Sequence, residues 1–460
     1  MHPLKDLRTA SARLGHTYLG RILSKLAMSS GADFASLLRM TKAVSSHEEL
    51  NYFVDYVINM LNTPGHPASP FIERVMSYLT PYGKQRLFQT MLYNCWIWGH
   101  TRRKRLSEQH GITSFPIVLV LSPSNACNLR CEGCYASGYG RADTLPLPLV
   151  MRILDECEEL GLFLIVLSGG EPLLYPHTME LIERYHYFFF HIYTNGTLIT
   201  REKAERLAQL GNVMLLISIE GFQENTDARR GKGVFQRLQE SFACLREFRV
   251  PFGTSITVTR RNLHEVTSYE FLNFLVEQGA LVNYYFMYVP VDGSGDFSLM
   301  LSPEGRDYLR SRLKAIRSHI PLLIIDFWND GPYVRGCIAG GRRYFHINAR
   351  GDIEPCVFTH FATHNIRDTT ILEALESPLF RDIQSRQPYT PNHLRPCMII
   401  DCPWVARDLI EKHGAKPTHP RALNLYFDHY DELLKFSEEY RGLADRAWQE
   451  DWHGKGFFEF

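Results

Sequence analysis

The sequence lacks several features that would place the protein in a simple class. No apolar run approaches the roughly 18 residues of a membrane-spanning helix, and the start, "MHPLKDLRTASARLG", has no apolar core of signal-peptide length. Neither charge is in excess, because 50 basic residues balance 50 acidic ones, so no whole-chain field points to nucleic acid. Internal repeats and low-complexity segments are also absent. We therefore expect a cytoplasmic protein with no nucleic-acid partner.

Cysteine is scarce, and its distribution is uneven. The 460-residue chain has 10 cysteines, and in a cytosolic protein thiols are more often metal ligands or catalytic groups than disulfide partners. Cys95, Cys157 and Cys244 stand alone in segments with helical periodicity, where we expect small buried side chains. The other seven form one set of three and one set of four, and we expect the chemistry there.

The periodicity of apolar residues divides the chain. In residues 1–110, the segments "LGRILSKLAM", "EELNYFVDYVINMLN" and "PFIERVMSYL" repeat apolar positions at helical spacing, which predicts a helical N-terminal domain. Over residues 111–330, six short apolar runs alternate with helical segments. These runs begin with "FPIVLVLS" and "GLFLIVLSGG" and end with "VNYYFMYVP". Alternation of this kind predicts a parallel sheet, either doubly wound or an incomplete barrel, with its functional loops beyond the carboxyl ends of the strands.

Two further regions follow. The segment "GGRRYFHINARGDIEPC" has the turn "ARGD" between two short apolar runs, which predicts a hairpin in a small domain over residues 331–406. The tail, residues 407–460, is charged and rich in aromatics, and we predict that it is helical.

The set of three cysteines lies in "SPSNACNLRCEGCYASG", residues 122–138, directly after the first predicted strand. Cys127, Cys131 and Cys134 have the spacing C-x3-C-x2-C. A cluster that only carries electrons takes four thiolates, so three thiolates leave one iron open to a substrate or cofactor. Zinc is the alternative, but no fourth ligand lies nearby in the sequence. The spacing favours an open iron–sulfur cluster.

With these motifs the chain resembles the radical S-adenosylmethionine (radical SAM) enzymes. The resemblance covers residues 114–300 or so and implies an α/β fold, a partial (β/α)6 barrel. It also implies that the three cysteines hold a [4Fe–4S] cluster on which S-adenosylmethionine is reductively cleaved. The resulting 5′-deoxyadenosyl radical would abstract hydrogen from a substrate carbon.

The same resemblance implies residues that bind the cofactor. The segment "GGEP" matches the part that receives the cofactor's amino group, and "SIEG" matches the strand end that contacts the ribose. In "TDARRGKG", Arg230, with Arg229 as the alternative, matches the arginine that pairs with the methionine carboxylate. Many relatives carry an aromatic before the third cysteine, where this chain has Gly133; Tyr135 follows that cysteine instead. The implied cofactor-binding residues are Gly169, Gly170, Glu171, Pro172, Ser218, Glu220, Arg230 and Tyr135.

The set of four cysteines resembles the auxiliary-cluster extensions called SPASM and twitch domains. Cys337, Gly351 and Cys356 match the entry pattern of that extension, and Cys397 and Cys402 follow with C-x4-C spacing. Seven cysteines would serve two clusters, so four imply one auxiliary [4Fe–4S] cluster that is fully ligated by protein. Zinc on the same four thiolates is the alternative.

Partners and substrate are less constrained. The resemblance implies a reducing partner such as flavodoxin or ferredoxin, and a substrate that is either a peptide or an apolar small molecule. Residues 84–105, "KQRLFQTMLYNCWIWGHTRRKR", join aromatic residues to a basic cluster, which suits peripheral contact with a membrane but is also typical of a core helix. The N-terminal region has no strand pattern for the small winged domain that binds a leader peptide in many peptide-modifying relatives. This makes a peptide substrate less expected without excluding it, since a separate protein can bind the leader. A non-catalytic iron–sulfur electron carrier or scaffold is the alternative function, although it would need no cofactor pocket.

Overall fold

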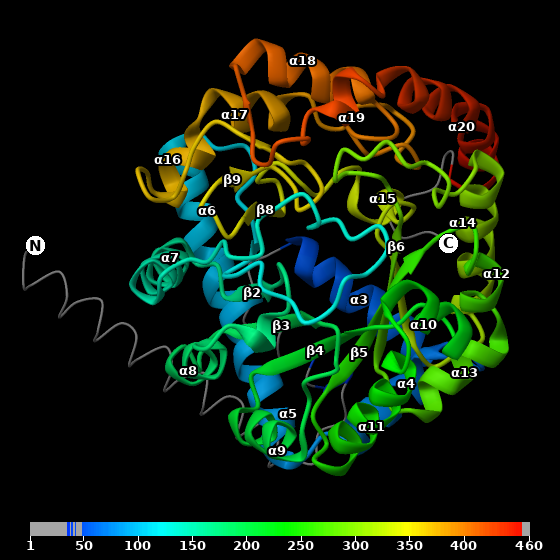
Figure 1. Cartoon of the computed structure of the whole chain (residues 1–460). Coiled ribbons are helices and arrows are strands. Elements are labelled where there is room, and N and C mark those ends of the chain that lie inside the picture. The colour runs from blue at the N-terminus through cyan, green and yellow to red at the C-terminus, as the bar shows by residue number, and fades with distance from the viewer. Residues whose placement is uncertain (1–34, 37, 40–41, 43–47, 453–460) are drawn as a thin grey trace, which may run out of the picture.

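A computed structural model describes residues 35–36, 38–39, 42 and 48–452 (Figure 1). The predicted helix "LGRILSKLAM", residues 19–28, lies outside the described residues. The helix predicted over 48–62 is present as α3, Glu48–Asn62. In the part of the chain that is described, no helix is both long enough and apolar enough to cross a membrane.

The core is one nine-stranded sheet in the order β7-β6-β5-β4-β3-β2-β1-β8-β9. All six predicted strands are present, and each pairs in parallel with its neighbour. β7 extends the parallel sheet beyond β6, and β8 joins it beside β1. The strands are β1 Val118–Leu121, β2 Leu164–Leu167, β3 Phe189–Thr194, β4 Val213–Ser218, β5 Phe252–Val258, β6 Val282–Met287, β7 Leu323–Asp326, β8 Tyr344–Ile347 and β9 Ile353–Glu354.

Helices between the strands cover the outer face of this sheet. The longest are strongly amphipathic, and their apolar faces bury outward-facing strand residues such as Leu119, Phe190 and Leu215, which are fully buried. Connections of this βαβ type give a partial barrel with helices outside. The helices are α7 Leu147–Leu160, α8 Thr178–Arg184, α9 Arg201–Leu210, α10 Gln223–Arg230, α11 Val234–Glu247, α12 Leu263–Val266, α13 Tyr269–Glu277, α14 Pro303–Arg317 and α15 Gly331–Val334.

The inner face of the sheet is concave. The Tyr193 ring on β3 lies 6.0 Å from Tyr284 and 5.9 Å from Phe286, centroid to centroid. Tyr284 and Phe286 belong to β6, and two strands separate β6 from β3 in the sheet. Because these rings meet across the intervening strands, the sheet must curve around them, as in a partial barrel.

The N-terminal helices contact loops at the amino ends of the strands. Arg74 donates hydrogen bonds to the carbonyl oxygens of Val276 and Ala280, which precede β6. Arg103 donates to Gly161, which precedes β2. The elements are α4 Ala68–Tyr78, α5 Pro81–Leu87, the π-helical segment η1 Phe88–Trp98 and α6 Gly99–His110. They therefore lie at the end of the barrel opposite the predicted chemistry.

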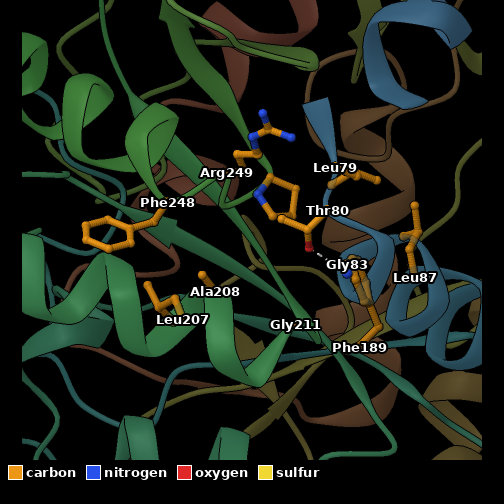
Figure 2. Close-up of a pocket in the computed structure, with 11 residues that line it drawn as sticks. Leu79, Thr80, Gly83, Leu87, Phe189, Leu207, Ala208, Gly211, Phe248 and Arg249 are labelled. Atoms are coloured by element: carbon orange, nitrogen blue, oxygen red, sulfur yellow. Dashed lines mark hydrogen bonds between the residues drawn. The ribbon is translucent and has the colours of Figure 1, made fainter. Parts of the chain in front are cut away.

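The segment 84–105 packs mainly as a core helix would. Its predicted basic cluster is not wholly exposed, because Arg103 is 4% exposed and burial lowers its pKa to about 10. Trp98 stacks on Phe163 at 4.6 Å. A small cavity of about 60 Å³ lies nearby between α5 and α9, lined by residues such as Leu79 and Phe189 (Figure 2). It lies at the same end of the barrel as these helices.

The C-terminal region meets the loop with the three cysteines, where Tyr139 bonds to Thr418, and also the end of α6, where His110 bonds to Glu376 (Figure 1). The hairpin predicted around "ARGD" is present, with β8 and β9 antiparallel. The sequence did not predict that β8 would also pair with β1, which makes the auxiliary region continuous with the barrel sheet. The remaining elements are β10 Phe361–Ala362, α16 Ile371–Glu376, α17 Pro378–Ser385, α18 Pro403–His413, β11 Lys416–Pro417, α19 Asn424–Phe427 and α20 Tyr430–Asp451.

Candidate functional site

The loop with the three cysteines follows β1, as predicted, and several contacts fix its path. Arg141 donates to the carbonyl oxygens of Cys127 and Leu129 at 2.8 and 2.7 Å. The N–H of Glu132 donates to the carbonyl of Arg229 at the end of α10. The loop is thus held against the carboxyl end of the sheet by bonds that need no metal.

The three thiols are free, partly exposed and near one another. Burial raises the pKa of Cys127 and Cys134, and each thiol interacts electrostatically with Cys131. Asn195 Nδ2 lies 3.9 Å from Cys127 Sγ, and Arg230 Nη1 lies 3.9 Å from Cys131 Sγ. Three convergent thiols flanked by N–H donors are a suitable donor set for an open iron–sulfur cluster.

Gly169 and Gly170 stand where the chain passes very close to the cysteine loop. The N–H of Gly170 donates to the carbonyl of Ser124. A Cβ on Gly169 would lie 2.6 Å from that same oxygen, and one on Gly170 would lie 2.3 Å from the carbonyl oxygen of Ala126. The glycines therefore allow a close approach of two backbone segments of the protein.

Tyr135 does not lie as a free aromatic surface beside the cysteines. Its hydroxyl bonds to Ser168 Oγ at 2.7 Å and accepts from the N–H of Gly169 at 3.1 Å. Gly133 has a positive φ, and a Cβ at that position would lie only 2.4 Å from the Tyr288 ring, which fills the space beside it. Tyr135 thus holds the glycine loop, and the Tyr288 ring leaves no room for a side chain at position 133.

The Glu171 carboxylate is fully buried and already bonded to protein. It accepts from the N–H groups of Leu173 and Asn195 and from the Thr194 hydroxyl, at 2.7–2.9 Å. Burial raises its pKa above the ordinary value despite these bonds. Glu171 therefore links the loop after β2 to the end of β3, and Pro172 begins a short 3₁₀ turn beside it.

Glu220 and the two arginines form a buried cluster. Glu220 Oε1 accepts from Arg229 Nη1 at 2.7 Å and from Arg230 Nη2 at 2.5 Å, and its Oε2 accepts from the N–H of Thr257. Burial acts to lower the pKa of Arg230, but Glu220 and the nearby thiols Cys131 and Cys134 outweigh it and raise that pKa. The structure therefore pairs Glu220 and Arg230, two predicted cofactor residues, with each other.

Replacement of Glu220 by Gln is expected to destabilise the protein strongly, because two buried guanidinium groups would lose their counter-charge. Removal of one partner of a buried ion pair costs about 3–5 kcal/mol. The fall should be visible in the midpoint of thermal unfolding. Glu247→Gln is the matched control, since Glu247 pairs with Arg201 on the surface, where ion pairs contribute about 0–1 kcal/mol. Equal midpoints for the two variants would contradict this account of Glu220.

Ser218, at the end of β4, is the predicted cofactor residue whose side chain remains free. It is half-buried, and its hydroxyl makes no hydrogen bond within the described residues. Its position at the carboxyl end of the sheet, beside Glu220, fits a hydroxyl that contacts a ribose.

The four later cysteines also lie together. Cys337 interacts electrostatically with each of the other three, and burial raises the pKa of every thiol in the set. None forms a disulfide. Among the described residues, no three His, Cys, Asp or Glu side chains are arranged to hold one metal ion directly. The donor set itself, four free thiols from three separate segments, fits a cluster that is ligated only by protein.

A buried polar network beside these cysteines was not predicted. His346 bonds to Ser122 Oγ at 2.8 Å and to Glu354 at 2.6 Å. Glu354 also accepts from the hydroxyls of Tyr139 and Thr418. The network joins the end of β1 to β8, β9 and the C-terminal region. The sequence offered only scattered histidines and hydroxyls, with no spacing that would have indicated it.

Fold and site together define an enzyme built on a partial barrel, with one thiol set at the carboxyl ends of the strands and a second beside β8, where Cys356 contacts Tyr344. Residues 121–272 match the radical SAM superfamily, and residues 337–403 match SPASM, an iron–sulfur cluster-binding domain. The chain therefore carries a radical SAM domain and a SPASM domain. Its radical SAM domain binds a [4Fe–4S] cluster and S-adenosylmethionine, and its SPASM domain binds an auxiliary iron–sulfur cluster.

Individual relatives agree with this assignment. The chain is 28% identical over 306 residues to an AdoMet-dependent heme synthase of Methanosarcina barkeri, which covers 59% of this chain and 86% of that protein. It is 35% identical over 177 residues to the mycofactocin maturase MftC of Mycobacterium tuberculosis, an alignment that covers 36% of this chain and 44% of that protein. Streptococcus suis SuiB, solved with bound S-adenosylmethionine, shares the fold at a TM-score of 0.54 and 19% identity. The superposition covers 76% of this chain and 84% of SuiB.

Proposed function

We propose that this enzyme abstracts hydrogen from an uncharged part of a peptide substrate that enters the barrel. A cluster with bound S-adenosylmethionine supplies the 5′-deoxyadenosyl radical. In the proposal Cys127, Cys131 and Cys134 hold that cluster. Ser218 contacts the cofactor, and the Glu220–Arg230 pair and the glycine loop fix the walls around it. A flavodoxin or ferredoxin is the proposed electron donor.

The observation that carries the substrate proposal is the character of the inner face. Tyr193 and Tyr284 face each other across the barrel, and His191 lies two residues before Tyr193 on the same face of β3. No hydrogen-bond partner for these three side chains occurs among the described residues. Burial lowers the pKa of His191 to about 4 and raises that of Tyr284 to about 12. All three groups are therefore neutral near pH 7 and open to a ligand.

Charge is missing from the central strands of this surface; at its edge, Glu354 of β9 lies on the same face but is buried and bonded to His346. The inward positions of β2 to β6 carry no Lys, Arg, Asp or Glu; they are Leu164, Val166, Phe189, His191, Tyr193, Met214, Leu216, Ser218, Gly253, Ser255, Thr257, Val282, Tyr284 and Phe286. Burial of an unpaired charge is costly, so the surface disfavours a carboxylate-rich ligand. A purely apolar ligand would leave the neutral donors and acceptors without partners. Peptide amides and an uncharged side chain would supply both kinds of contact.

Relatives support two substrate classes. MftC is named a maturase, and another relative is named PqqA peptide cyclase. The heme synthases and an Fe-coproporphyrin III synthase represent tetrapyrrole chemistry and align with this chain over similar or greater lengths. The uncharged inner face favours the peptide class, because coproporphyrin carries several carboxylates.

Deuterium transfer into 5′-deoxyadenosine tests the proposal. Reconstituted enzyme, S-adenosylmethionine and dithionite would be incubated with a deuterated peptide of uncharged residues, with deuterated Fe-coproporphyrin III, or with a deuterated, uncharged isoprenoid alcohol. We expect transfer from the peptide alone. Transfer from either other compound would change the substrate class, and failure to form 5′-deoxyadenosine under any condition would overturn the enzymatic assignment.

Replacement of His191 by Phe is expected to lower deuterium transfer from the accepted substrate about tenfold, because a ligand group would lose a hydrogen bond worth roughly 1–3 kcal/mol. Iron content should stay at the wild-type value. His177→Phe is the control, since His177 pairs with Glu180 on the surface. Unchanged transfer in the His191 variant would remove this residue from the substrate site.

A further inference from the structure

Tyr344, on β8, places its hydroxyl directly on one of the auxiliary cysteines. The hydroxyl oxygen lies 2.7 Å from Cys356 Sγ. Both residues are buried, at 4% and 6% exposure, in an apolar cluster with Val120 and Ala339. Within the described residues the hydroxyl has no other hydrogen-bond partner. The contact is therefore isolated from bulk water.

The direction of this hydrogen bond follows from the chemistry of the sulfur. A cysteine that ligates iron has no S–H, so its sulfur can only accept and the tyrosine O–H must donate. The N–H of Phe358 also approaches this sulfur, at 3.4 Å. In the described part of the chain, no side-chain O–H or N–H donates to the sulfur of Cys337, Cys397 or Cys402. The tyrosine therefore makes the four ligands unequal.

We propose that the Tyr344 hydroxyl raises the reduction potential of the auxiliary cluster through its hydrogen bond to Cys356. Reduction adds negative charge to the cluster, and a donor aimed at a ligating sulfur stabilises that charge, which is how hydrogen bonds to sulfur set cluster potentials. Burial strengthens the effect, because no solvent dipole can replace the lost donor. This inference rests on the proposed ligation of the auxiliary cluster by the four later cysteines.

The test is a potentiometric titration followed by electron paramagnetic resonance. It uses protein in which Cys127, Cys131 and Cys134 are alanine, so that only the auxiliary cluster gives a signal. Tyr344→Phe keeps the ring in its apolar site and removes only the hydroxyl. We expect about four irons per chain, as in the parent, and a midpoint at least 59 mV more negative, a tenfold change for a one-electron couple.

Tyr389→Phe is the matched control. Tyr389 is near Cys337, Cys397 and Cys402, but its hydroxyl bonds to Gln387 and Met398 and to no cysteine sulfur. Its midpoint should equal that of the parent. An equal shift in both variants, or none in Tyr344→Phe, would overturn the proposed role of Tyr344.

A second substitution covers the case in which Tyr344→Phe loses iron. Placing 3-fluorotyrosine at 344 strengthens the donor, so the midpoint should move in the positive direction, and an unchanged midpoint would overturn the inference. Absence of iron from the parent, with Tyr344 intact, would instead overturn the ligand assignment. The two failures are thus distinguishable.

Discussion

Replacement of Cys127, Cys131 and Cys134 together by alanine is expected to abolish 5′-deoxyadenosine formation and to halve the iron content. Two four-iron clusters give about eight irons per chain, and loss of the first leaves about four. Alanine offers no ligand, whereas the loop itself keeps its supports, because Arg141 and the backbone of Arg229 hold it without any sulfur. The loss should therefore be one of ligation with the fold retained.

Iron analysis measures the iron content per chain, and chromatography of 5′-deoxyadenosine after incubation with dithionite measures cofactor cleavage. Cys244→Ala is the control, since this cysteine stands alone on α11 and is only half-buried. It should keep about eight irons and full cofactor cleavage. Cofactor cleavage at the wild-type rate in the triple variant would contradict the assignment of these three cysteines.

The parts of this protein that were predicted from sequence depend on local pattern. Strands β1 to β6 are short apolar runs bounded by helices of clear periodicity, and each lies where its pattern placed it. The hairpin around Asp352 was also predicted, because its turn residues are contiguous. Local spacing likewise separated the two cysteine sets from the three solitary cysteines, of which Cys95 and Cys157 are buried as expected. The domain boundaries stay a prediction.

The parts that could not be predicted depend on contacts between distant segments. Nothing in "SIEG" indicates that the Glu220 carboxylate pairs with two arginines nine and ten residues later. The pairing of β8 with β1 joins residues more than 200 positions apart. The bond from Tyr344 to Cys356 crosses a hairpin whose register had to be known first. In each case the sequence identified the residue types, and the fold decided their partners.

One such contact bears on the auxiliary site. Cys397 and Cys402 flank Asp401, which is fully buried and paired with Arg306 of α14, with Nη1 2.5 Å from Oδ1. Asp401 Oδ2 also accepts from the N–H of Cys397. Arg306 further bonds to the carbonyl of Leu394 and lies over the Tyr440 ring at 3.9 Å. This loop is therefore anchored to the barrel helices by the protein itself, whichever metal the cysteines hold.

Replacement of Cys397 by alanine is accordingly expected to empty the auxiliary site while the fold and the first cluster persist. Iron should fall from about eight to about four per chain. Turnover of the native substrate should be lost, whereas cleavage of S-adenosylmethionine without substrate should continue, because that reaction needs only the first cluster. Iron analysis, substrate turnover and 5′-deoxyadenosine formation measure the three quantities separately.

Metal analysis of the protein that lacks the first three cysteines decides which metal the auxiliary cysteines bind. About four irons, removed by the further change Cys397→Ala, would support the cluster. One tightly bound zinc and no iron would mean that the four thiolates form a structural clasp, since zinc has no redox chemistry. The ion pair between Asp401 and Arg306 already anchors this loop to the barrel, so zinc would only add stability to a loop that the protein holds without metal. An iron–sulfur cluster on the same four cysteines could instead accept or donate an electron next to the inner face, where substrate is proposed to bind.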